Sequence, residues 1–202
     1  SCDLCRQSSG KTCLKINGAK ANANGADMVI AQDSGRVYGE LIAQGYLQNY
    51  IPADLKDKIP AENQTPLVFA YMNKVLVYNN ENGKAAPITN IWQLTEPSMK
   101  GKFFFKSPMQ EGINANFLTM LTKPEVADQL AKSYEEQYKK KLELTTPNAG
   151  YEWIKMAFSN GLVMGSSDTS MTESIGVKGQ DMNGVGLLNY SKLRYAEKKN
   201  LA

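Results

Sequence analysis

The chain has 202 residues, of which 42% are hydrophobic and 21% charged, and its formal net charge is +3. These values are ordinary for a globular protein, and the length allows one sizeable core or two small lobes. No stretch comes close to the roughly 18 consecutive apolar residues that a membrane-spanning helix needs. The lysines are scattered and rarely alternate with aromatic residues, so the composition argues against nucleic-acid binding.

Histidine is absent, and all cysteines lie near the N-terminus, at Cys2, Cys5 and Cys13. The lack of histidine excludes Ser-His-Asp and Cys-His catalysis, together with the H-E-x-x-H type of metal site. Cys2 and Cys5 have the spacing of half a zinc knuckle, but only Cys13 is available as a third ligand. The spacing also allows one disulfide, Cys2–Cys5 or Cys5–Cys13. We expect no metal site and no cofactor.

The N-terminal part of the chain predicts an irregular segment followed by a strand. Residues 1–25 show little apolar periodicity. Residues 26–31 form a short apolar run of the kind found in buried strands. Polar side chains follow this run at its carboxyl end, namely Gln32, Asp33 and Ser34.

The next part of the chain predicts a short helix and a long extended segment. Apolar residues recur at helical spacing over 37–42, and Gly45 is the expected C-cap. Residues 67–79 contain two β-rich runs with no turn signal between them. This pattern predicts a strand that crosses between two lobes rather than a hairpin.

From residue 88 onward the chain alternates between apolar runs of strand type and helical patterns. Thr122 and Glu125 fit a capping box that opens a helix, and Tyr134 and Tyr138 lie on its apolar face, where we expect core packing. The expected strands are residues 102–106, 162–165 and 185–190. The expected helices are residues 88–95, 117–121, 122–138 and 148–158, followed by one after residue 166.

The stretch 162–176 combines an apolar strand with a strongly capped helix start. Residues 167–170 are all of N-cap type, and Ser170 with Glu173 fits the S-x-x-E capping box. A helix that begins at the carboxyl end of a strand directs free N–H groups and its positive dipole end into the crevice there. In open α/β sheets this crevice is where ligands bind.

Four expected strands end in polar residues, at 32–34, 107–112, 167–170 and 189–191. The repeated strand–helix pattern predicts an α/β fold with mixed sheets flanked by helices. Hydroxyl, amide and carboxylate groups without histidine are more typical of a polar binding cleft than of a catalytic centre.

Several motifs resemble the extracellular solute-binding proteins of bacterial ABC importers, the family that includes the ferric-iron binders. The motifs are residues 26–33, 75–79, 91–97 with Lys100-Gly101, Ser107-Pro108, and 185–195. The resemblance covers residues 26–202. It implies a two-lobe fold like the type II periplasmic binding proteins, with residues 26–72 as part of lobe 1, including a crossing strand, and residues 73–202 as lobe 2. Because family members are longer, it also implies a partial chain.

The resemblance implies a set of ligand contacts. Residues 110–114 and the Asp168-Thr169 pair match anion-contacting positions, and Tyr190 matches one iron-binding tyrosine, with Ser191 in place of the other. Fe³⁺ needs several anionic oxygen ligands, so a metal chelate, an anion or a small polar solute fits better than bare iron. The expected ligand-binding residues are Gln32, Asp33, Ser34, Ser107, Gln110, Gly112, Asn114, Ser167, Asp168, Thr169 and Tyr190.

The resemblance therefore predicts a non-enzymatic, monomeric solute-binding component of a bacterial ABC importer, whose partners are the solute and the membrane permease. Its expected location is the periplasm or the outer side of the membrane, where Cys2 is a conceivable lipid-anchor site. Two alternatives remain at this point. One is an enzyme on a similar scaffold that uses Asp33 or Asp168 as an acid–base group, and the other is a binding module that has lost its transport function.

Overall fold

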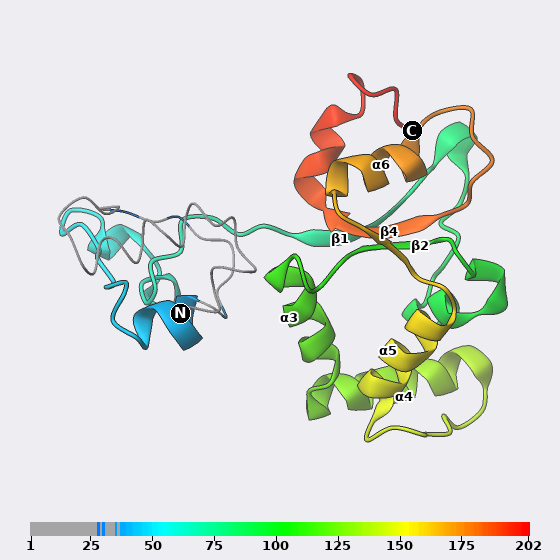
Figure 1. The fold of residues 1–202 in the computed structure, drawn as a ribbon, viewed down its shortest axis with the longest axis horizontal. Coiled ribbons are helices and arrows are strands. Elements are labelled where there is room, and N and C mark those ends of the chain that lie inside the picture. The colour runs from blue at the N-terminus through cyan, green and yellow to red at the C-terminus, as the bar shows by residue number, and fades with distance from the viewer. Residues whose placement is uncertain (1–27, 29, 31–34, 36) are drawn as a thin grey trace. The chain divides into compact units, whose positions relative to one another are not determined.

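The computed structural model describes residues 28, 30, 35 and 37–202. The chain divides into two compact units, Ser1–Tyr71 (unit 1) and Met72–Ala202 (unit 2), shown in Figure 1. The predicted irregular segment, residues 1–25, lies outside the described residues, and so do the three cysteines within it. The predicted site residues Gln32, Asp33 and Ser34 lie outside them as well.

The described part of unit 1 consists of short helical turns and extended chain. Val37–Ile42 forms a π-helical turn (η2), and the predicted C-cap Gly45 has a φ of 71°, which glycine adopts without strain. Two 3-10 turns follow, η3 (Lys56–Lys58) and η4 (Ala61–Asn63). The amide of Asn49 links distant parts of this chain, because it donates to the Gln64 carbonyl and accepts from the Leu67 N–H.

Two strand predictions in this region differ from the structure of the described residues. Met28 and Ile30, the described residues of the predicted strand at 26–31, lie outside any strand and are highly exposed. Of the extended segment predicted over residues 67–79, only Lys74–Tyr78 (β1) is a strand, and it joins the sheet of unit 2.

Unit 2 is built on a mixed sheet with the strand order β1-β4-β2-β3. The other strands are β2 (Phe103–Lys106), β3 (Val163–Gly165) and β4 (Val185–Asn189). Strand β2 runs parallel to both β3 and β4, whereas β1 is antiparallel to β4. The sequence-based prediction of an α/β fold with a mixed sheet is confirmed for this unit.

Helices cover both faces of this sheet (Figure 1). One face carries α3 (Gly112–Leu121), α4 (Pro124–Tyr138) and α5 (Ala149–Ser159). The other face carries α6 (Asp168–Gly176) and the 3-10 segment η8 (Tyr190–Tyr195). Three further 3-10 turns precede β2, namely η5 (Glu81–Gly83), η6 (Ile91–Thr95) and η7 (Pro97–Met99).

The alternation of side chains along β2 divides the core into two layers. Phe103 and Phe105 pack with Trp92 and Trp153 in the layer under α3, α4 and α5. Phe104 points to the opposite layer, where it packs with residues of α6 and β4. The predicted core role of Tyr134 and Tyr138 is confirmed, because both pack against the first layer.

The starts of two helices differ from the predicted capping boxes. Lys123, not Thr122, is the N-cap residue of α4, and Pro124 takes the first helical position, where its missing N–H costs nothing. The N-cap of α6 is Ser167, whose hydroxyl accepts the N–H of Ser170. Ser170 therefore lies inside the helix.

Helices α3 and α5 meet at backbone distance. A Cβ placed on Gly150 would lie 1.9 Å from the carbonyl oxygen of Leu121, the last residue of α3. Asn148, which caps α5, also donates its side-chain amide to the Thr122 carbonyl. The end of α3 is thus held directly against the first turn of α5.

Candidate functional site

The sheet topology of unit 2 brings several predicted polar segments to one edge. The parallel strands β2, β3 and β4 end there, and the antiparallel strand β1 begins there, because Lys74 is paired with Asn189. We call this side of the sheet the carboxyl edge. It contains the polar segments 107–112, 167–170 and 189–191, which follow the parallel strands.

Charged side chains from different elements form a continuous chain of ion pairs at the carboxyl edge. The Nζ atom of Lys74 lies 3.1 Å from Asp168 Oδ2 and 3.2 Å from Glu111 Oε2. The Nζ atom of Lys106 lies 3.5 Å from the same Glu111 oxygen. We call Asp168, Lys74, Glu111 and Lys106, in this order, the four-charge chain. It connects the start of β1, the end of β2 and the first turns of α3 and α6.

The four-charge chain is largely buried. The side-chain exposure is 8% for Asp168, 9% for Lys74, 14% for Glu111 and 23% for Lys106. Removing charges from water is expensive, and a buried ion pair often adds no net stability over apolar residues of the same size. Buried charge concentrated at the carboxyl edge is therefore a reason to look for function there.

Two buried oxygens at or near the carboxyl edge accept no hydrogen bond among the described residues, Asp168 Oδ1 and Asn114 Oδ1. The amide nitrogen of Asn114 is satisfied, because it donates to the Lys106 carbonyl over 2.7 Å. Most buried polar atoms in folded proteins have a partner, so such exceptions need a reason. For a carboxylate oxygen such as Asp168 Oδ1, the missing partner is a hydrogen-bond donor.

The first turns of α3 and α6 supply further hydrogen-bond donors at this edge. Glu111 is the N-cap residue of α3, but its carboxylate pairs with lysines and makes no capping hydrogen bond. The N–H groups of Gly112 and Ile113, in the first turn, have no intrahelical acceptor. The same holds for the N–H groups of Asp168 and Thr169 in α6. These groups and the helix dipoles favour acceptor or anionic oxygens.

Most of the predicted site residues in unit 2 lie at or next to the carboxyl edge. Ser107 donates its N–H to the Gly165 carbonyl, which joins the ends of β2 and β3. Gly112, Ser167 and Thr169 are half-buried around the four-charge chain, and Asn114 is fully buried. Gln110 is exposed.

Tyr190 lies at the β1–β4 side of this edge. Its backbone N–H donates to the Asn73 carbonyl, and the residue is 58% exposed. Because the predicted partners from unit 1, Gln32, Asp33 and Ser34, are outside the described residues, the candidate site is defined by unit 2 alone.

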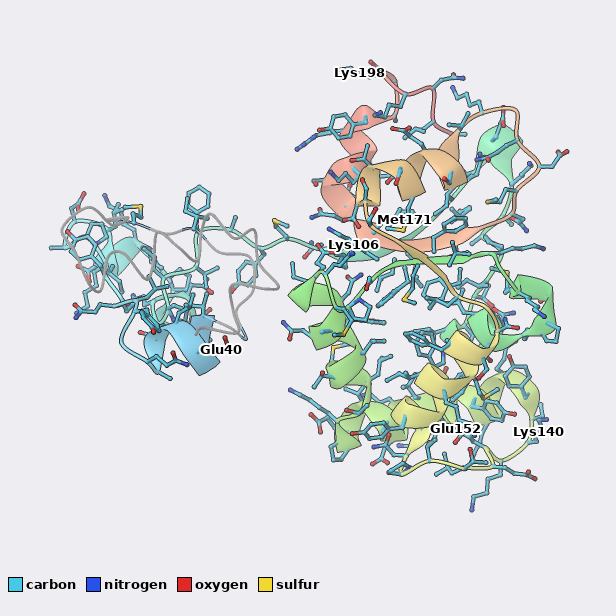
Figure 2. All side chains as sticks on the ribbon, viewed as in Figure 1. Glu40, Lys106, Lys140, Glu152, Met171 and Lys198 are labelled. Carbon is cyan, nitrogen blue, oxygen red and sulfur yellow. The ribbon has the colours of Figure 1, made fainter. Side chains whose placement is uncertain are left out.

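The sequence-based prediction missed the charged centre of this site, since Lys74, Lys106 and Glu111 were not among the expected ligand residues. A signal was present in the sequence for both lysines. Lys74 begins and Lys106 ends an otherwise apolar strand, where a charged side chain lies at the rim of the sheet. Figure 2 shows Lys106 at this rim.

No helix among the described residues is long and apolar enough to cross a membrane. The same residues contain no cluster of Cys, Asp or Glu side chains arranged to hold a metal ion. Comparisons with protein families, with curated proteins and with solved structures find no match for this chain.

Proposed function

We propose that this protein captures a small polar or anionic solute at the carboxyl edge of unit 2, without converting it chemically, as the binding component of an importer. The observation that supports this proposal is the meeting of two helix N-termini with the half-buried Lys106 at one edge of the sheet. Backbone N–H groups and an ammonium together are a common recognition site for carboxylate or phosphate oxygens.

The importer role rests on the sequence resemblance to the solute-binding proteins of bacterial ABC importers. In this proposal unit 2 corresponds to the second lobe of a type II periplasmic binding fold, and unit 1 to part of the first lobe. The protein works as a monomer outside the cytoplasmic membrane and delivers its solute to a permease. In such proteins, closure of the lobes on the ligand is the signal to the partner.

Thermal unfolding of the full chain in the presence of candidate solutes tests the proposal. The panel contains inorganic phosphate, sulfate, ferric citrate, glucose, amino acids and spermidine. A ligand that binds only the native state raises the melting temperature, and at equal concentration a tighter ligand raises it more. We expect at least one member to do so, and the rise to shrink in Lys106→Gln. If no member raises the melting temperature, the proposed function is wrong.

A further inference from the structure

The four-charge chain alternates in sign and ends in opposite charges. From Asp168 the order is negative, positive, negative, positive, ending at Lys106. The inner members, Lys74 and Glu111, are each shared between two partners. The outer members each have one ion-pair partner among the described residues, so both retain unused hydrogen-bonding capacity.

The positive end has room for an anionic group. Lys106 has only one contact in the four-charge chain, to Glu111 at 3.5 Å, and it is the most exposed of the four side chains. An ammonium carries three N–H donors, and the nearby N–H groups of Gly112 and Ile113 lack intrahelical acceptors. A carboxylate or phosphate at this end would accept hydrogen bonds from both sources.

The negative end requires a donor. Asp168 Oδ2 is bonded to Lys74, whereas Oδ1 is buried without a partner among the described residues. Lys74 bonds Asp168 Oδ2 and Glu111 Oε2, and no described hydrogen bond runs from its ammonium to Oδ1. A buried carboxylate oxygen without a donor is unfavourable, and a ligand N–H would relieve that cost. Because the atom is buried, the side chains around it have to move before a solute can reach it, and the donor group has to be small.

We propose that the carboxyl edge binds a zwitterionic solute with a primary ammonium and a carboxylate or phosphate group. The ammonium donates to Asp168 Oδ1, and the anionic group accepts from Lys106 and the first turn of α3. This inference rests on the proposed function and narrows its ligand class. The four-charge chain is neutral as a whole, and a zwitterion with one carboxylate keeps the site neutral, whereas a simple anion would add a negative charge near Glu111 and Asp168.

Calorimetric titration of the full chain with matched probes tests this inference. The zwitterions are glycine, β-alanine, 4-aminobutyrate and, for the phosphate arm, O-phosphoethanolamine. Each amino acid has two controls of the same chain length, the carboxylate without an amine and the N-trimethyl derivative, which keeps both charges but has no N–H. Phosphocholine and ethyl phosphate serve the phosphate arm. We expect one zwitterion to bind about tenfold or more tightly than both of its controls.

Two variants assign the ends of the ligand. Asp168→Asn is expected to reduce affinity for the zwitterion by about tenfold, whereas affinity for the simple anion should not fall, because a negative charge near it is removed. Lys106→Gln is expected to weaken binding of both the zwitterion and the simple anion. Lys140→Gln, which replaces an exposed lysine away from this edge, should change neither affinity. If Asp168→Asn does not fold, the comparison of each zwitterion with its N-trimethyl derivative still decides the role of the donor.

The outcomes separate the two proposals. If a simple carboxylate or phosphate binds as tightly as its zwitterion, or if N-trimethylation has no effect, the zwitterion inference is wrong and solute capture stands. If no probe binds here and no solute raises the melting temperature in the wider panel, both proposals fall.

Discussion

Two buried carboxylates in unit 2, Glu152 and Asp168, are in opposite states of hydrogen bonding. Glu152 is 4% exposed, and both of its oxygens accept hydrogen bonds from the segment before α5. The donors are the N–H of Thr145 at 2.7 Å and the hydroxyls of Thr145 and Thr146. Asp168 is 7% exposed, and within the described part of the chain only its Oδ2 is bonded.

The comparison indicates that the buried charge of Glu152 has a structural role, whereas that of Asp168 is a candidate for a functional role. The hydrogen bonds of Glu152 connect residues 145–146 to the first turn of α5, and both of its carboxylate oxygens have donors. Asp168 is bonded to Lys74 through Oδ2, and its Oδ1 has no partner among the described residues. Figure 2 shows Glu152 and Lys106 in different parts of unit 2, so the two arrangements can be altered independently.

The largest effect is expected when the four-charge chain loses its central cation. Lys74→Met leaves Asp168 buried without a countercharge and Glu111 with only the longer contact to Lys106. Removing one partner of a buried ion pair typically costs about 3–5 kcal/mol. Urea denaturation measures the change. Lys132→Met, at an exposed position of α4, should stay within about 0.5 kcal/mol of the wild type. Equal stability of the two variants would contradict the prediction.

A smaller loss is expected when the satisfied carboxylate is changed. Glu152→Gln replaces one acceptor oxygen by an NH₂ group that faces threonine donors, and we expect a loss of about 2 kcal/mol of unfolding free energy. Lys155→Gln removes only the exposed ion pair to Glu152, at 3.9 Å, and should change stability by less than about 1 kcal/mol. Neither variant should alter binding at the carboxyl edge. A changed affinity would link the two regions.

The stabilising effect of Glu152 should depend on pH. Burial raises the pKa of this carboxyl, but the hydrogen bonds from Thr145 and Thr146 outweigh burial and hold the pKa below its ordinary value. A lowered folded-state pKa adds stability above the unfolded value of about 4.3, and this stability is lost as the pH falls through the folded-state pKa. The stability gap between the wild type and Glu152→Gln, measured in urea from pH 7 to pH 3, should narrow at the acidic end. If this stability difference grows as the pH falls, the prediction is wrong.

Among the substitutions of buried charges, Asp168→Asn is expected to have the smallest effect on stability. The amide oxygen can still accept from Lys74, Glu111 remains to balance the lysine charge, and the unbonded oxygen contributes no hydrogen bond that can be lost. We expect a loss of about 1 kcal/mol in the same urea assay. If this variant loses more stability than Glu152→Gln, the distinction between the two carboxylates is wrong.

Local patterns in the sequence predict much of unit 2. The phenylalanine run gives β2, and the spaced apolar residues with Asn148 as a cap give α5. The exact helix starts are harder, because Thr122 and Ser170 have the right chemistry for a cap but lie one residue before and three residues after the real ones. In α4, Pro124 takes the first helical position, so the residue directly before it, Lys123, is the N-cap.

Features that depend on distant pairing escape a local reading. Residues 67–72 have the same β-rich composition as β1, yet only β1 pairs with β4, more than one hundred residues further along the chain. The polar character of the carboxyl edge was predictable, since it follows from what ends each strand. The pairing of Lys74 with Asp168 was not, because 94 residues separate them and only the sheet order brings them together.

Helix α3 connects the close contact at Gly150 with the candidate site. The helix is a rigid rod roughly 15 Å long, with its last residue pressed against Gly150 and its N-cap residue, Glu111, in the four-charge chain. Any side chain at position 150 would have to push the far end of this rod aside. A displacement of α3 by such a side chain would also move Glu111, and with it the contacts to Lys74 and Lys106, although position 150 touches none of these charges.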